Sequence, residues 1–317
     1  MTDKDTKPEC IIIMSGGMDS AVCAAYAKKH YSTVHALTVS YGQRNPREID
    51  SAFNIATALK LQVHEPIQTA YKVLVGSSLI EFDKIPQYES MDDFKKCQEE
   101  RREKGDDKPD PTFVPGRNPF FFNIAVNRAY KLKITDILMG VSASDSDFPD
   151  CNKDFLQKEM APFYSFAVTG NRDTFRCVLP LIDLTKAQVV LKSKELLGDR
   201  FEEIMELTHT CYFPSRGGCG EKKCRACLFR EQAFKQVGIK DPLSKFRKSP
   251  TRQEASALTP LAEELLTQDL LAQELLPQEV SAQEEEVSAL TPSPQEPSPQ
   301  EVSAQQLSIP ELSTQEG

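Results

Sequence analysis

The chain has 317 residues, a formal net charge of −9 and nine cysteines. The charge is unevenly distributed, because residues 251–317 carry −12 and residues 1–250 carry +3. The C-terminal stretch contains no aromatic residue, histidine or cysteine but has seven of the 21 prolines. It cannot bury enough apolar surface to offset the entropy of ordering a chain. About 250 residues remain for a folded part, which is enough for a substantial core.

Apolar segments and cysteines indicate the cellular compartment. The first ten residues are mostly polar, and the apolar run at residues 11–14 is too short for a signal peptide. No stretch approaches the roughly 18 apolar residues that span a bilayer. The cysteines are odd in number and all lie within the first 227 residues, which does not fit a small secreted disulfide scaffold. We therefore expect a cytoplasmic protein without membrane contact, whose thiols are free or bind metal.

Apolar strands alternate with helical patterns through most of the first 200 residues. The pattern predicts strands at residues 11–14, 34–41, 62–66, 137–141 and 177–182. It predicts helices at residues 19–30, 46–59, 119–130, 155–166 and 185–197. Strands and helices that alternate at this spacing predict an α/β fold, a doubly wound parallel sheet with helices on both faces.

Residues 84–111 form an unusually charged connection between these elements. We favour a solvated surface helix or mobile loop for this stretch. The alternative is a lid over an active site, because the stretch leads directly into a Val-Pro-Gly-Arg-Asn turn at residues 114–118.

Beyond residue 249 the sequence is repetitive. Glutamine followed by an acidic residue recurs every five positions at residues 268, 273, 278 and 283. A five-residue period fits neither a straight helix nor a coiled coil. We therefore predict one folded domain over residues 1–248 and a low-complexity, disordered acidic tail over residues 249–317.

Residues 15–20 read Ser-Gly-Gly-Met-Asp-Ser, directly after a predicted buried strand and at the start of a helix. Glycines allow a sharp turn that brings backbone N–H groups close to an anion, and a helix N-terminus favours phosphate. A bare phosphate would repel Asp19, so this residue is expected to cap the helix, to bind Mg²⁺, or both. Neither a Walker A motif nor a Gly-x-Gly-x-x-Gly motif is present. The alternative is an ordinary strand-to-helix turn.

Four cysteines lie close together near the end of the predicted domain: Cys211, Cys219, Cys224 and Cys227. Four thiols within 17 residues match a closed tetrahedral zinc site with a structural role. Nearby cations at Arg216, Lys222, Lys223 and Arg225 favour thiolates. Two disulfides, or clustering by chance, are the alternatives. His209 could replace one ligand, but four cysteines already complete the site.

Further polar segments follow predicted strands, at the edge where a doubly wound sheet binds ligands. They are Tyr-Gly-Gln-Arg at residues 41–44, Thr-Phe-Val-Pro-Gly-Arg-Asn at residues 112–118, and residues 140–151 with three aspartates. Taken alone, Arg117 could be a surface residue, and Asp145, Asp147 and Asp150 could be turn formers.

Together these segments resemble the 7-cyano-7-deazaguanine synthases (QueC, preQ0 synthases), a family of PP-loop ATP pyrophosphatases. The resemblance rests on SGGMDS at 15, YGQR at 41, REI at 47, GSSL at 76, TFVPGRN at 112, GVSASD…FPDC at 140 and the cysteine cluster ending in CLFR. SGGMDS is common to PP-loop enzymes, whereas TFVPGRN, the PDC element and the four cysteines are more specific. The resemblance covers residues 10–230 and nothing of the tail.

The resemblance implies an ATP-dependent ligase that converts 7-carboxy-7-deazaguanine and ammonia, through adenylated intermediates, to an amide and then a nitrile. It implies Mg²⁺ with ATP, a homodimer and no direct binding of nucleic acid. The catalytic residues would be Asp19, Ser20 and Arg117. ATP would bind at Met14, Ser15, Gly16, Gly17, Met18, Asp19 and Ser20. The deazaguanine substrate would bind at Gln43, Arg44, Arg117, Asn118, Asp145 and Asp150.

Three features depart from the family pattern. Asn45 stands where the family usually has histidine, the segment from Asp145 to Pro149 is one residue shorter, and the cysteine spacing is x7, x4, x2 rather than x8, x2, x2. These departures leave open a PP-loop paralogue that adenylates a different acceptor. A tRNA-modifying enzyme would be expected to have a larger positive charge than the +3 of residues 1–250, and an added RNA-binding domain. A non-enzymatic scaffold would be expected to have a degraded loop.

Overall fold

The computed structural model describes residues 7–247, apart from residues 65, 70–73, 82–83 and 107. The chain divides into two units, Met1–Asp269 and Leu270–Gly317. All described residues belong to the first unit. The predicted acidic tail at residues 249–317 lies outside the described residues, so its predicted disorder stays a prediction.

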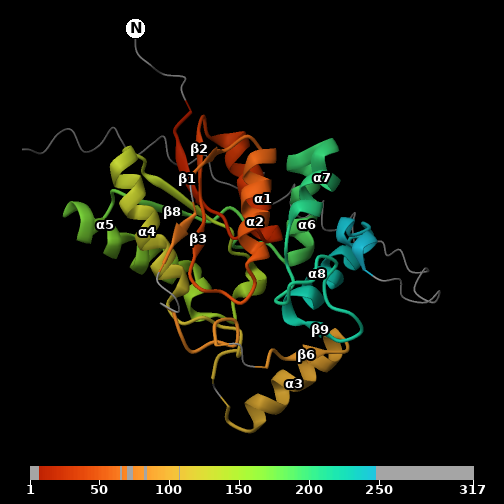
Figure 1. Ribbon diagram of the computed structural model, residues 1–317. Helices are drawn as coiled ribbons and strands as arrows, with labels where there is room; N and C mark the ends of the chain where they lie inside the picture. Colours follow the sequence, from red (N-terminus) through yellow and green to blue (C-terminus); the bar gives the residue numbers. More distant parts are fainter. Residues whose placement is uncertain (1–6, 65, 70–73, 82–83, 107, 248–317) are drawn as a thin grey trace, which may run out of the picture. The chain divides into compact units, whose positions relative to one another are not determined.

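A five-stranded parallel sheet forms the centre of the described region (Figure 1). Every pairing within it is parallel, and β1 lies between β2 and β7. All residues of these three strands are buried, as expected for a parallel sheet that is covered on both faces. In spatial order the strands are β4 (Gln62–Val63), β2 (Val34–Leu37), β1 (Cys10–Ile13), β7 (Asp136–Met139) and β8 (Arg176–Val178).

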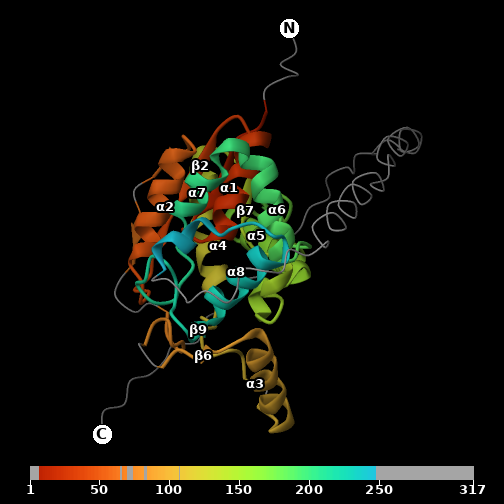
Figure 2. The ribbon, with the colours of Figure 1, turned by 90° about the vertical axis from the view of Figure 1, so that its right-hand side faces the viewer.

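Helices cover both faces of this sheet (Figures 1 and 2). Cys10 and Ile12 of β1 share one core with five helices, whereas Ile11 and Ile13 share a second core with two helices. This division follows from the alternation of side chains along a strand, and it confirms the predicted doubly wound α/β fold. The first face carries α1 (Met18–His30), α2 (Arg47–Ala58), α6 (Lys186–Leu197), α7 (Phe201–Leu207) and α8 (Arg225–Gln236); the second carries α4 (Arg117–Leu132) and α5 (Ala161–Thr169).

Three predicted strands, at residues 34–41, 62–66 and 177–182, are shorter or divided because proline interrupts the pairing, and the second is reduced to β4 at Gln62–Val63. The segment at residues 34–41 divides into β2 and β3 (Val39–Ser40), and β3 pairs with β5 (Ile67–Gln68) outside the main sheet. Pro66 precedes β5 and has no N–H to continue the ladder from β4. At residues 177–182, β8 ends at Val178, because Pro180 follows and the chain continues in turns.

The predicted helix at residues 155–166 begins as a π-helix, Phe155–Met160, and continues as α5. Pro162 lies in the first turn of α5. Without an N–H it cannot donate to the carbonyl four residues earlier, which disrupts α-helical pairing at this point. Shorter helical turns complete the described region: Ala143–Asp145, Pro149–Cys151, Gly198–Arg200 and Pro242–Phe246.

The charged stretch at residues 84–111 contains β6 (Gln87–Tyr88) and α3 (Met91–Glu103), so the surface-helix interpretation is confirmed. Ser90 caps α3 by accepting a hydrogen bond from the N–H of Asp93. β6 pairs antiparallel with β9 (Lys223–Cys224) of the cysteine segment. Figures 1 and 2 both show α3 beside β6 and β9, away from the central sheet.

None of the helices within the described part of the chain is both long and apolar enough to cross a bilayer.

Candidate active site

A cavity of about 260 Å³ opens at the carboxyl ends of β1 and β7, the edge at which a doubly wound sheet binds ligands. The segment at residues 13–20, the 140–151 connection, the first turn of α4 and the start of α8 all contribute to its wall. The following predicted site residues line it: Met14, Ser15, Gly17, Met18, Asp19, Ser20, Gln43, Arg117, Asn118 and Asp145. Gly16, Arg44 and Asp150 are not part of the lining.

The loop at residues 15–20 requires glycine for a steric reason. Gly16 has a φ of +79°, and a Cβ atom there would lie 2.2 Å from the backbone oxygen of Glu48. The loop therefore packs directly on α2. Gly17 is the N-cap of α1 and provides no side-chain cap, and its own N–H donates to the hydroxyl of Ser15 at 3.4 Å. Ser20 is buried, and its hydroxyl donates to the carbonyl of Gly17 at 2.9 Å.

Asp19 does not cap α1, so that part of the prediction is wrong. Its Oδ2 instead accepts a hydrogen bond from Nζ of Lys186 at 2.8 Å. Its Oδ1 is buried and has no hydrogen-bond partner among the described residues. Burial raises the pKa of Asp19 above its ordinary value, although Lys186 acts in the opposite direction. One carboxylate oxygen thus remains available to a ligand.

Lys186 is a site residue that was not among those predicted from the sequence. It is the first residue of α6, its side chain is 13% exposed, and its Nζ also lies 3.8 Å from Oδ2 of Asp145. Burial alone would lower the pKa of Lys186, but Asp19 and Asp145 outweigh burial and raise it. A lysine in the first turn opposes the helix dipole. That local conflict, directly after the Thr185 cap, is a signal that could have revealed the residue.

Arg117 and Glu48 both line the cavity, although they belong to helices far apart in sequence. Arg117 begins α4 and makes a hydrogen bond to Tyr41; burial lowers its pKa, but Tyr41, Asp150 and Cys151 together outweigh burial and raise it. Glu48 lies in the first turn of α2 and lines the cavity. Burial raises the pKa of the Glu48 carboxyl to about 7, against the opposing effect of Arg117. In the sequence Glu48 stands out only as part of the Arg-Glu-Ile motif at residues 47–49, since a glutamate is ordinary in a first turn.

The remaining predicted substrate residues make mostly internal contacts. Asp145 accepts hydrogen bonds from the N–H and hydroxyl of Ser142. Asp150 is buried and accepts from the N–H of Asn118 at 3.2 Å. Gln43 accepts from the N–H of Tyr41, and the Arg44 guanidinium lies 5.5 Å from the ring centre of Phe213.

The four predicted cysteines lie together. Their sulfur atoms are all within 4.8 Å of one another, so the group could hold a metal ion. Backbone N–H groups of Phe213, Cys219 and Cys224 donate to sulfur atoms of the group. Hydrogen bonds within the group lower the pKa of Cys219 and Cys224 and raise that of Cys211 and Cys227. The combination of grouped thiols and N–H donors is typical of a site built for a cation.

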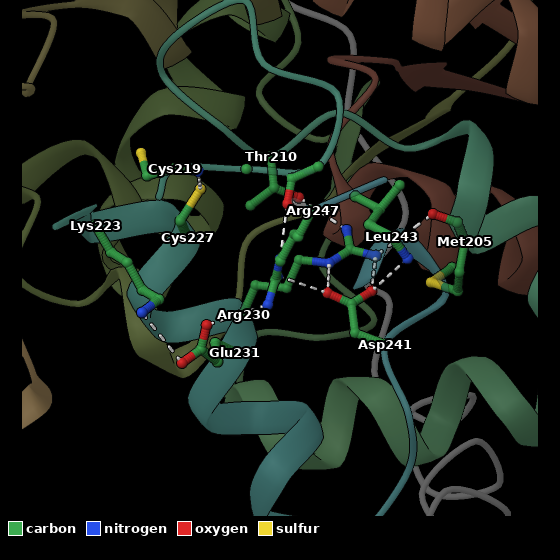
Figure 3. Close-up of polar contacts among 12 residues, drawn as sticks. Met205, Thr210, Cys219, Lys223, Cys227, Arg230, Glu231, Asp241, Leu243 and Arg247 are labelled. Atoms are coloured by element: carbon green, nitrogen blue, oxygen red, sulfur yellow. Dashed lines mark hydrogen bonds and ion pairs between the residues drawn. The ribbon is translucent and has the colours of Figure 1, made fainter. Parts of the chain in front are cut away.

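A buried ionic network supports the segment that carries these cysteines (Figure 3). Arg230 is 1% exposed and binds both carboxylate oxygens of Asp241, at 2.9 and 3.0 Å. Arg247 also binds Asp241 and donates to the carbonyl of Gly217. Because Arg230 lines the cavity as well, the network connects the cysteine segment, α8 and the cavity wall.

Asn45 contacts His209, and both are buried. The Asn45 amide also donates to the carbonyls of Cys211 and Phe213. The backbone N–H of His209 donates to the carbonyl of Gly16. His209 lines the cavity but is not part of the cysteine group. These contacts connect the glycine loop to the cysteine segment.

The family profile and the curated relatives agree on one family. The family profile described as "Queuosine biosynthesis protein QueC" matches residues 9–238. The 7-cyano-7-deazaguanine synthase of Gloeobacter violaceus is 40% identical over 243 residues, covering 76% of this chain and 98% of the relative. The enzyme of the same name from Desulfatibacillum aliphaticivorans is 34% identical over 239 residues, covering 74% and 96%. Among solved structures, the NMN synthetase from Francisella tularensis has 15% identity and a TM-score of 0.36, covering 82% of this chain and 83% of its own.

Proposed function

The chain belongs to the family of queuosine biosynthesis protein QueC, and from this premise we infer that it is an ATP-dependent 7-cyano-7-deazaguanine synthase. The observation that carries the inference is the extent of the match. Every residue that lines the cavity falls within residues 9–238, the part that matches the family. We propose 7-carboxy-7-deazaguanine and ammonia as the substrates. A paralogue that adenylates another acceptor is not favoured.

The loop at residues 15–20 is proposed to hold the triphosphate of ATP, with Met14 and Met18 beside it. The N–H groups at the start of α1 and the cation of Lys186 would stabilise the pyrophosphate that leaves when a carboxylate is adenylated. Oδ1 of Asp19, which has no hydrogen-bond partner within the described part of the chain, is a hard oxygen ligand that fits Mg²⁺. Mg²⁺ would neutralise phosphate charge there. Ser20 acts through its hydrogen bond to Gly17, which maintains the loop.

The opposite part of the cavity is proposed to hold the deazaguanine. The guanidinium of Arg117 suits the substrate carboxylate, because its donors match two carboxylate oxygens. Gln43, Asn118 and Asp145 line the cavity and can bind the polar edge of the base. Asp150 lies outside the lining and would act by orienting Asn118. Arg44, packed against Phe213, would support the wall.

Glu48 is proposed to accept protons during nitrile formation. Ammonia loses one proton when it displaces AMP to form the amide. Adenylation of the amide oxygen removes a second proton from nitrogen, and expulsion of the second AMP to form the nitrile removes a third. A carboxylate with a pKa of about 7 is matched to this task near neutral pH. Glu48 lines the same cavity as Arg117.

The four cysteines are proposed to bind one structural zinc ion, with no open position for substrate. We expect Cys224→Ser to lose the metal and to lower the thermal midpoint, because binding free energy at a structural zinc site is largely folding free energy. The effect should be large, since Cys224 is fully buried and its N–H also donates to Cys219. Elemental analysis of protein purified in reducing buffer measures the metal.

Cys97→Ser is the matched control for this variant, because Cys97 is a partly exposed cysteine of α3 outside the group. It should keep one zinc per chain. Wild-type protein without zinc, or Cys224→Ser protein with a full complement, contradicts the assignment.

The proposed function is tested by product analysis. Incubation with ATP, Mg²⁺, ammonia and 7-carboxy-7-deazaguanine should yield the nitrile, detected by mass spectrometry, with two ATP consumed for each nitrile formed. Cleavage between the α and β phosphates should give AMP and pyrophosphate. ADP as the main product, or AMP formation that does not depend on the deazaguanine, would overturn the proposal. Homodimer formation and a cytoplasmic location stay predictions.

A further inference from the structure

Arg225 connects three parts of the molecule that are far apart in sequence. It lies between Cys224 and Cys227 as the first residue of α8, and it is only 6% exposed. Part of its side chain lines the cavity. A buried arginine must be paired to offset the loss of hydration, and the partners of this arginine come from elsewhere.

The ionic partners of Arg225 include the connection that follows β7. Its NH2 group donates to Oδ2 of Asp147 at 2.9 Å and contacts the carbonyl of Ser144 at 3.4 Å. Its NH1 group lies 3.7 Å from Oδ2 of Asp110, a buried oxygen that has no hydrogen-bond partner in the described part of the chain. One guanidinium thus holds the 143–151 segment and the residues before the Arg117 turn.

The faces of the guanidinium are covered by aromatic rings from three segments. Its carbon lies 4.9 Å from the ring centre of Phe148, 5.0 Å from that of Phe229 and 5.4 Å from that of Phe94. A planar cation can stack on rings while its edges make hydrogen bonds, and an ammonium group cannot reproduce both contacts. Phe94 belongs to α3, so the charged insertion is attached at the same point.

We propose that Arg225 is a positioning residue that fixes the 143–151 segment against the cavity and so couples the substrate pocket to the four-cysteine segment. Ser144, Asp145, Phe148 and Cys151 of the 143–151 segment line the cavity. Asp145, which is proposed to bind the deazaguanine, belongs to this segment. The proposal rests on the proposed function, because it concerns the site for the deazaguanine.

The test compares Arg225→Lys with Asp147→Asn. The side chain of Asp147 is 57% exposed, so its substitution leaves the fold intact even if replacing the buried arginine does not. Asp154→Asn is the matched control, because Asp154 makes an exposed ion pair with Lys158 and does not line the cavity. The measurements are KM for each substrate, kcat, zinc content and hydrogen exchange of residues 143–151.

We expect KM for 7-carboxy-7-deazaguanine to rise about 3- to 10-fold in Asp147→Asn and more in Arg225→Lys. KM for ATP, kcat and zinc content should stay within about twofold of wild type, because the effect is transmitted only through the 143–151 segment to the deazaguanine site. Hydrogen exchange should become faster in residues 143–151, and the control should match wild type. The double variant should resemble Arg225→Lys alone, because both changes remove the same contact.

A role confined to folding would lower the active fraction, and hence kcat, with KM unchanged, and this result would overturn the proposal. Additive effects in the double variant, or unchanged exchange of residues 143–151, would overturn it as well. Failure of the proposed function is a separate outcome, since wild-type enzyme would then form no nitrile.

Discussion

Asp19→Asn should lower kcat for nitrile formation by about a hundredfold or more, the size of effect found when one preorganised charge-stabilising group is removed. The variant is nearly isosteric but removes the charge that pairs with Lys186 at 2.8 Å. It also alters the carboxylate whose Oδ1 is proposed to bind Mg²⁺. Pyrophosphate release and exchange of labelled pyrophosphate into ATP measure the adenylation step directly.

Lys186→Met should produce a comparable loss, and the two substitutions combined should lose little more than either alone, because they disable one unit. Lys194→Met is the control, since Lys194 is an exposed lysine on the same helix. A double variant whose losses multiply would contradict a shared role for Asp19 and Lys186. If Asp19→Asn exchanged labelled pyrophosphate into ATP at the wild-type rate, the nucleotide would have to bind elsewhere.

The parts of the site that could be predicted from the sequence are those whose residues lie close together along the chain. Residues 15–20 and the four cysteines each lie within a short segment, so their spacing alone predicts a phosphate loop and a metal-binding group. Lys186 approaches Asp19 across 167 positions, and no local pattern records such a pairing. The same holds for Arg225, whose partners lie on α3 and after β7.

The fold was predictable to the level of layers, since buried strands alternate with helices along the chain. The boundaries depended on proline and on tertiary pairing. Pro66 and Pro180 shorten or divide strands whose apolar pattern continues past them. A cap on α1 was one of the two roles expected for Asp19, the other being Mg²⁺ binding, but the buried cation of Lys186 competes for the carboxylate. Charge pairing in a buried site outweighs a local capping preference.

Glu48→Gln should lower kcat by about 10² to 10⁴, the range for removal of a general base. Wild-type kcat should fall as the pH drops through about 7, because the carboxyl takes up a proton and can no longer accept one from nitrogen. The variant should lose this pH dependence while it keeps the exchange of pyrophosphate into ATP in the absence of ammonia. Asp50→Asn, an exposed first-turn substitution on the same helix, should behave as wild type.

The pH dependence of stability gives an independent measurement of the raised pKa of the Glu48 carboxyl. Its pKa in the folded protein lies above its ordinary value of 4.5, so the folded state favours the protonated form. The stability associated with that proton is fully present below about pH 4.5 and is lost as the pH rises through about 7. Glutamine cannot ionise, so at pH 8 Glu48→Gln should have a higher free energy of unfolding than wild type, by on the order of 1 to 3 kcal/mol, and a higher unfolding temperature. At pH 4 the variant and wild type should unfold at nearly the same temperature. A variant that is less stable at pH 8 would show that the carboxylate is stabilised by a partner rather than held as a base.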